Sequence, residues 1–217
     1  MSSHEILENL KKAVVEYDAD GAASWARKAI EEKIDPIEAV DALTEAVRGV
    51  GNAFSRGELW LPDLFGAAEA MKSAMPILEE EIKRRGVTRK SLGTVVIGTV
   101  FGDIHDIGKT MVATVLTAEG FSVHDLGVNV TTEQFIEAVK EHKADILAMS
   151  SLLTTSALEQ QKVIEILKKE GLKDKVKVMV GGSAITEEFA KEIGADGYEA
   201  TAPGAAELAK RLIGVEE

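Results

Sequence analysis

The chain has 217 residues, no cysteine, a formal net charge of −12 and 45% hydrophobic residues. The missing cysteines exclude disulfides, thiolate metal sites, iron–sulfur clusters and cysteine nucleophiles. The acidic balance argues against nucleic-acid binding, because few cations are left to neutralise phosphates. The sequence has neither an apolar run of membrane-spanning length nor the blocks of a signal peptide, so we expect a cytoplasmic protein.

The first part of the chain, up to residue 86, shows helical periodicity and no strand-like segment. Pro36 and Pro62 each suit a first helical turn, and Asp35 suits the N-cap before Pro36. Pro76 should kink or break the last helix. Four helices with short connections favour a small antiparallel bundle as a domain of residues 1–86. The helices are expected at about 5–17, at about 22–33, from 36 and from 62.

The periodicity changes after a predicted linker at residues 87–92, and residues 93–217 form the second expected domain. Apolar runs of strand length alternate there with helical stretches. Such alternation predicts an α/β fold, a flavodoxin-like (Rossmann-like) five-stranded parallel sheet covered on both faces. The strands are expected at 94–100, 122–126, 145–150, 176–180 and near 197–199. The helices are expected at about 107–119, 132–142, 156–170, 187–193 and 205–212.

The first predicted strand is followed by the loop Gly102-Asp103-Ile104-His105-Asp106-Ile107-Gly108-Lys109. Open α/β sheets bind ligands at this end of their strands. The loop is no phosphate loop, because five residues rather than four separate Gly102 from Gly108, and no dinucleotide fingerprint is present. A phosphoacceptor site is disfavoured too, because the third strand ends in Ser150-Ser151-Leu152 without a carboxylate.

His105 is the candidate metal ligand of this loop. A lone loop histidine usually makes only a backbone hydrogen bond, but Asp103 lies two residues before it and can hold the imidazole, as metal-bound histidines require. One His and one Asp cannot hold a bare zinc ion, and the other histidines lack suitable neighbours. Any metal is therefore expected inside a cofactor that leaves an axial position to the protein.

Two further segments follow predicted strands: 150–156, rich in serine and threonine, and Gly181-Gly182-Ser183. Taken singly, the hydroxyls are explained by helix capping and the glycines by a tight turn. Three such segments at one edge of the sheet favour a common ligand.

The combined pattern Asp103-x-His105-x-x-Gly108, Ser150-x-Leu152 and Gly181-Gly182, separated by 41 and 28 residues, resembles the cobalamin-binding fingerprint. The helical part is similar to the cap of methionine synthase and of corrinoid proteins, with Leu59-Trp60-Leu61-Pro62-Asp63-Leu64 matching its helix corner. The two-domain chain resembles small corrinoid proteins that partner methanol, methylamine and quaternary-amine methyltransferases.

This resemblance implies cobalamin as cofactor and a role for each matched residue. His105 would be the lower axial cobalt ligand, with Asp103 and then Ser150 behind it as a proton relay. Gly108 would let the displaced nucleotide tail pass. The loop would also contribute Gly102, Ile104 and Asp106 to cofactor binding. The slot for the tail would be lined by Ser150, Leu152, Thr154, Gly181, Gly182 and Ala202. The upper, methyl-bearing face would be covered by Trp60 and Leu64.

The resemblance also implies a function, a corrinoid methyl carrier without a complete active site of its own. It would take a methyl group from a substrate-specific methyltransferase, for a methylamine or quaternary amine first and methanol next. A second methyltransferase would pass the group to tetrahydrofolate or coenzyme M, and a reductive activator would restore the cofactor. The alternatives are a cobalamin-dependent sensor, disfavoured by the lack of a DNA-binding segment, and a mutase subunit, disfavoured by the helical cap.

Overall fold

The computed structural model describes residues 1–86 and 91–215. The chain divides into two compact units, Met1–Lys90 and Ser91–Glu217. The predicted linker, 87–92, lies for the most part outside the described residues. The domain limits 1–86 and 93–217 therefore stay a prediction.

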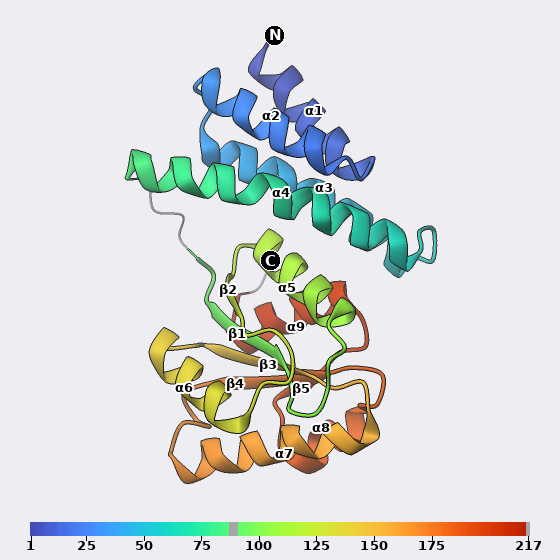
Figure 1. Cartoon of the computed structure of the whole chain (residues 1–217), viewed down its shortest axis with the longest axis vertical. Helices are drawn as coiled ribbons and strands as arrows, with labels where there is room; N and C mark the ends of the chain where they lie inside the picture. Colours follow the sequence, from blue (N-terminus) through green and yellow to red (C-terminus); the bar gives the residue numbers. More distant parts are fainter. Residues whose placement is uncertain (87–90, 216–217) are drawn as a thin grey trace. The chain divides into compact units, whose positions relative to one another are not determined.

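Residues 1–86 form a four-helix unit, as predicted (Figure 1). Asp35 caps the third helix, because its Oδ1 accepts a hydrogen bond of 2.9 Å from the N–H of Ile37. The fourth helix continues through Pro76, so the predicted break is absent. The helices are α1 (Ser3–Val15), α2 (Ala19–Glu31), α3 (Pro36–Ser55) and α4 (Leu61–Arg85). Their core includes the fully buried side chains of Ile6, Leu10, Leu43, Leu64, Met71 and Leu78.

Residues 91–215 form an α/β unit around a five-stranded parallel sheet of order β2-β1-β3-β4-β5. This is the flavodoxin-like order, and it confirms the predicted fold class. The strands are β1 (Thr94–Thr99), β2 (Ser122–Asp125), β3 (Ile146–Ser150), β4 (Lys177–Gly181) and β5 (Gly197–Tyr198). The helices are α5 (Ile107–Glu119), α6 (Thr132–His142), α7 (Thr154–Lys169), α8 (Glu187–Ile193) and α9 (Ala202–Leu212).

Helices cover both faces of this sheet (Figure 1): α5 and α9 lie on one face, and α6, α7 and α8 lie on the other. One buried cluster joins the sheet to the α6–α8 layer. Gly98 permits a close approach there, since a Cβ at Gly98 would lie 2.8 Å from the ring of Phe135. Such packing fixes the central strands, whose carboxyl ends carry the candidate site.

The strand register brings the three predicted segments together. Thr99 of β1 pairs with Ser150 of β3, and Ser150 pairs with Gly181 of β4. The loops that follow these strands therefore begin side by side at one edge of the sheet, as the sequence predicts. Among the helices of residues 1–86 and 91–215, none combines the length and apolar character needed to cross a bilayer.

Candidate functional site

The loop that follows β1 begins with a tight turn. The N–H of Asp103 donates to the carbonyl of Val100 at 3.2 Å, and Gly102 has a φ of +78°. A positive φ at this point of a turn favours glycine, which explains Gly102 without reference to a ligand. The turn places Asp103 inward and His105 outward.

His105 is held by Asp103 through two hydrogen bonds. The His105 Nδ1 lies 2.7 Å from the Asp103 Oδ1, and the His105 backbone N–H donates to the same oxygen at 3.0 Å. The Asp103 side chain is fully buried, whereas the His105 side chain is 48% exposed. With Nδ1 engaged, Nε2 is the ring nitrogen that can reach a ligand, which is the arrangement expected of a metal-binding histidine.

The second oxygen of Asp103 caps the start of α7. Its Oδ2 accepts from the N–H of Leu152 at 2.7 Å, from the N–H of Leu153 at 3.3 Å and from the hydroxyl of Ser156 at 3.0 Å. Burial alone would raise the pKa of Asp103, but the hydrogen bonds, those from His105 first, outweigh burial and lower the pKa to about 2. Asp103 is therefore a fixed anion that orients the imidazole.

The hydroxyl behind Asp103 is that of Ser156 and not, as predicted, that of Ser150. No hydrogen bond among the described residues joins Ser150 to Asp103. Ser150 ends β3, and its carbonyl accepts from the N–H of Val100 at 3.1 Å. The carboxylate reaches past the strand end to the first turn of α7, where Ser156 is buried and also lies 2.8 Å from the Ser151 hydroxyl. Sequence spacing alone does not reveal this arrangement.

Lys109, which ends the motif, takes no part in the exposed site. Its side chain is buried, and its ammonium group pairs with the carboxylate of Asp125 at the end of β2. This ion pair fastens α5 to the neighbouring strand. An engaged lysine agrees with the exclusion of a phosphate loop.

Bulky apolar side chains lie in the loops that follow β1, β2 and β3, and the β1 loop is the one that carries His105. Six of them are between 37% and 75% exposed. Exposed side chains of this size usually mark a binding surface when they cluster. We call this set the apolar rim: Phe101, Ile104, Ile107, Val128, Leu152 and Leu153. Ile104 and Leu152 were predicted, whereas the other four were missed, although bulky apolar residues in the loops after the strands were a usable signal.

The glycines of the site differ in what the fold demands of them. Gly182 has a φ of +112°, and a Cβ there would lie 2.0 Å from the Ser151 carbonyl oxygen, so the fold itself requires glycine. A Cβ at Gly181 would come within 3.2 Å of the Glu199 carbonyl oxygen. Gly108 has an ordinary φ and open space around it. Nothing among the residues that the structure describes requires glycine at Gly108, which fits a ligand that passes there.

The remaining predicted residues occupy helix starts. Asp106 is the N-cap residue of α5, and Thr154 and Ala202 are the first residues of α7 and α9. Thr154 is exposed, whereas Ala202 is buried. Near this edge, Gln160 is fully buried and donates to the Met149 carbonyl at 3.0 Å, but its Oε1 has no partner among the described residues.

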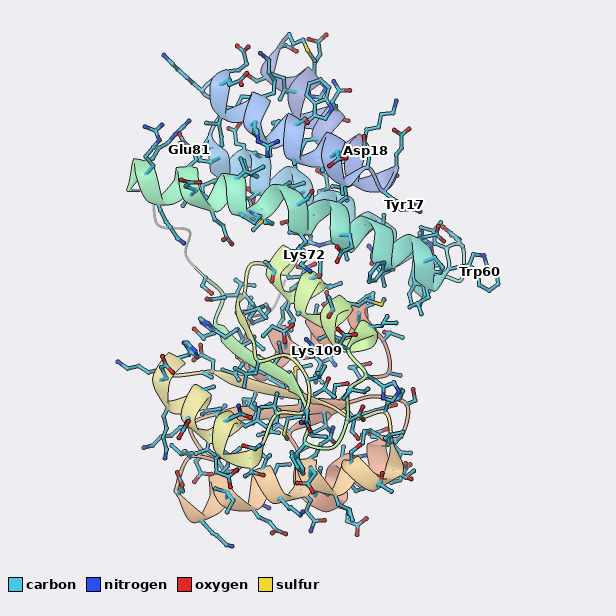
Figure 2. All side chains as sticks on the ribbon, viewed as in Figure 1. Tyr17, Asp18, Trp60, Lys72, Glu81 and Lys109 are labelled. Carbon is cyan, nitrogen blue, oxygen red and sulfur yellow. The ribbon has the colours of Figure 1, made fainter. Side chains whose placement is uncertain are left out.

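The four-helix unit supplies the last two predicted residues, and they differ sharply. Trp60 is 76% exposed and points away from the bundle at the start of α4 (Figure 2), whereas Leu64 is 1% exposed in the bundle core. Leu64 therefore offers no exposed surface in this structure. Leu61 and Phe65 are exposed beside Trp60 in sequence and were missed.

The residues present fit a corrinoid better than a bare metal. No group of three or more His, Asp or Glu side chains within residues 1–86 and 91–215 is placed to hold an ion. One histidine exposed at the strand ends whose loops carry the apolar rim, with space at Gly108, matches a large, flat cofactor that brings its own metal and leaves one axial position open.

Comparison with known proteins agrees with this interpretation. Residues 93–207 match the family described as the B12 binding domain, and residues 6–79 match a second family of the same description. The chain is 44% identical to trimethylamine corrinoid protein 1 of Methanosarcina acetivorans, over 91% of this chain and 92% of the relative. It is 43% identical to a corrinoid protein of Desulfitobacterium hafniense strain Y51, over 96% and 98% of the two chains.

A solved structure extends the likeness to three dimensions. The structure is the methanol:cobalamin methyltransferase complex of Methanosarcina barkeri, one chain of which superposes with a TM-score of 0.84 at 31% identity. The match covers 98% of this chain and 81% of that chain. With a cobalamin fingerprint, a histidine site and relatives along its whole length, the chain belongs to the family of B12-binding corrinoid proteins.

Proposed function

We propose that this protein carries methyl groups between two methyltransferases, with cobalamin as its cofactor. The observation that carries the proposal is His105, fixed by a buried carboxylate and exposed at the strand ends whose loops carry the apolar rim. When bound, cobalamin supplies a cobalt centre that can accept and release a methyl group. The protein supplies the axial histidine and the surroundings of the cofactor.

Asp103 and Ser156 set the properties of His105. The anionic carboxylate accepts from Nδ1 and so fixes the tautomer in which Nε2 is the ligand atom. The Ser156 hydroxyl donates to the same carboxylate and takes the place expected for Ser150. Ser156, Asp103 and His105 are our proposed relay, in which the proton stays between Nδ1 and the anionic carboxylate and its position along that hydrogen bond shifts with the demand on Nε2.

Other residues bind the cofactor. The apolar rim offers a surface for the flat corrin macrocycle, because burying its exposed side chains is favourable. Gly108 leaves room for the nucleotide tail, and the slot beyond is proposed to run past Ser150, Thr154, Gly181, Gly182 and Ala202. Trp60 is proposed to cover the methyl-bearing face, a role for which Leu61 and Phe65 offer exposed surface and buried Leu64 offers none.

The proposed methyl donors follow the relatives. The relatives include trimethylamine and dimethylamine corrinoid proteins, and the solved complex is a methanol:cobalamin methyltransferase complex. A methylamine:corrinoid methyltransferase is therefore the first proposed partner. A methyltransferase for tetrahydrofolate or coenzyme M, a reductive activator and a cytoplasmic location complete the proposal. The sensor alternative has no support among these relatives.

The test is methyl transfer with defined partners. The protein is loaded with hydroxocobalamin, reduced, and mixed with radiolabelled trimethylamine, dimethylamine, monomethylamine or methanol and the methyltransferase for each. Label is expected to appear on the loaded protein with one amine and its methyltransferase, and not on the unloaded protein. Absence of label with every pair, together with a light-dependent change of oligomeric state, would overturn the carrier function in favour of a sensor.

A further inference from the structure

A second loop of the α/β unit is hydrogen-bonded to the His105 loop through one residue, Asn129. Asn129 lies in the connection from β2 to α6 and has a φ of 55°, a left-handed conformation that asparagine tolerates better than most residues. Its backbone N–H donates to the carbonyl of Asp103 at 2.9 Å. Its side-chain Oδ1 accepts from the N–H of Gly102 at 2.8 Å. One residue thus engages two consecutive residues of the His105 loop.

Beyond the turn hydrogen bond between Asp103 and Val100, two other contacts hold the His105 loop, and Asn129 adds to them. The Thr99 hydroxyl donates to the His105 carbonyl at 2.9 Å, and the Asp103 side chain is tied to the start of α7. Neither anchor engages the Gly102 N–H, which lies at an exposed turn. A rotation of the peptide there would swing the Asp103 backbone and disturb both hydrogen bonds to His105. The third anchor therefore comes from Asn129.

We propose that Asn129 is a positioning residue for His105, acting through Gly102 and Asp103. The inference deepens the proposed function and rests on His105 being the axial ligand. The Asn129 side chain is exposed, so its replacement leaves the core of the unit intact. Because only the side-chain oxygen accepts from Gly102, the acceptor can be removed while the backbone hydrogen bond to Asp103 stays.

Three substitutions distinguish the effect of losing the hydrogen-bond acceptor from the effect of straining the backbone at residue 129. Asn129→Ala removes the oxygen but strains a left-handed residue, and Asn129→Gly removes the oxygen without that strain. Asn129→Asp keeps an oxygen at the same position. Asn52→Ala makes the same change at an exposed position of α3 and serves as the control.

The first readout needs no cofactor. It is the rate of amide hydrogen exchange at Gly102, which is measured by NMR in protein whose fold is checked by circular dichroism. A neutral hydrogen bond is worth about 0.5–1.5 kcal/mol, so the Ala and Gly variants should exchange about two- to tenfold faster at Gly102. Asn129→Asp and Asn52→Ala should exchange as the wild type does. Unchanged exchange in both the Ala and the Gly variant would overturn the proposal.

The second readout uses hydroxocobalamin as the probe. The Ala and Gly variants should show a smaller fraction of the histidine-ligated visible spectrum and release cobalamin faster, and Asn129→Asp should restore both. Faster Gly102 exchange with a wild-type spectrum and wild-type release would also overturn the positioning role. A wild-type spectrum in His105→Ala would instead refute the axial assignment, and it would leave the Gly102 exchange result standing.

Discussion

Replacing Ser156 with alanine should remove a hydrogen bond to Asp103 and destabilise the α/β unit. The Ser156 hydroxyl is buried and lies 3.0 Å from the Asp103 Oδ2 and 2.8 Å from the Ser151 hydroxyl. Hydrogen bonds to charged groups contribute about 1.5–3 kcal/mol, so Ser156→Ala should lower the free energy of unfolding of the α/β unit by that amount. Loss of a hydrogen bond to the charged form should also raise the pKa of Asp103.

Ser150→Ala is the matched control, because Ser150 carries the same hydroxyl without a hydrogen bond to Asp103. It should change the free energy of unfolding by less than about 0.5 kcal/mol. Urea unfolding is followed by circular dichroism for the whole chain and by tryptophan fluorescence for the four-helix unit, since Trp25 and Trp60 both lie in that unit. A larger loss of stability for Ser150→Ala than for Ser156→Ala would refute the assignment of Ser156.

The remaining predictions concern pH, space and exposure. Burial first and then the charge on the neighbouring His142 lower the pKa of His124 below its ordinary 6.5. Stability is therefore full above pH 6.5 and falls as the pH drops through that value; urea midpoints at pH 5–8 should show this, and His124→Gln should flatten the dependence. Gly108→Ala should stabilise α5 by up to about 1 kcal/mol in melting experiments, because alanine favours a helix over glycine. The same change should weaken cobalamin binding about tenfold or more in spectroscopic titrations, and unchanged binding would contradict the proposed passage of the nucleotide tail at Gly108. Trp60→Ala should change the free energy of unfolding by less than about 0.5 kcal/mol, whereas Leu64→Ala should lower it by about 2–5 kcal/mol in thermal unfolding. Equal effects would contradict the assignment of Leu64, and not Trp60, to the bundle core.

The sequence predicted the α/β unit well because its elements carry local signals. Helices α5, α6 and α8 begin and end at the predicted residues, with Gly120 and Gly194 ending two of them in left-handed conformations. Helix α7 starts at Thr154 rather than Ser156, because its cap is the Asp103 carboxylate from a distant loop. Such a cap has no local sequence signal.

The N-terminal unit shows a second limit of sequence patterns. Pro76 removes one hydrogen bond from α4, at a cost of about 3 kcal/mol, but the helix is continuous because its apolar stripe packs against the other helices of the bundle. Trp60 and Leu64 fall one helical turn apart in the same motif. Only the packed structure shows that one side chain is exposed and the other buried.

The candidate site was predicted where a motif fixes position and missed where packing decides contacts. Asp103, His105 and Gly182 lie where the spacing placed them, at one edge of the sheet. Ser156 and Asn129 were missed because each meets the His105 loop from a segment more than twenty residues away along the chain. Their hydroxyl and amide groups carry no signal until the register is known.

The most direct test of the account is the visible spectrum of the protein loaded with hydroxocobalamin, with and without His105. The wild type should show the spectrum of cobalamin whose own base is displaced and whose cobalt is ligated by histidine. His105→Ala should lose that signature while its circular dichroism spectrum stays that of the wild type. An unchanged cobalamin spectrum in His105→Ala would contradict His105 as the axial ligand and, with it, the proposed arrangement of the site.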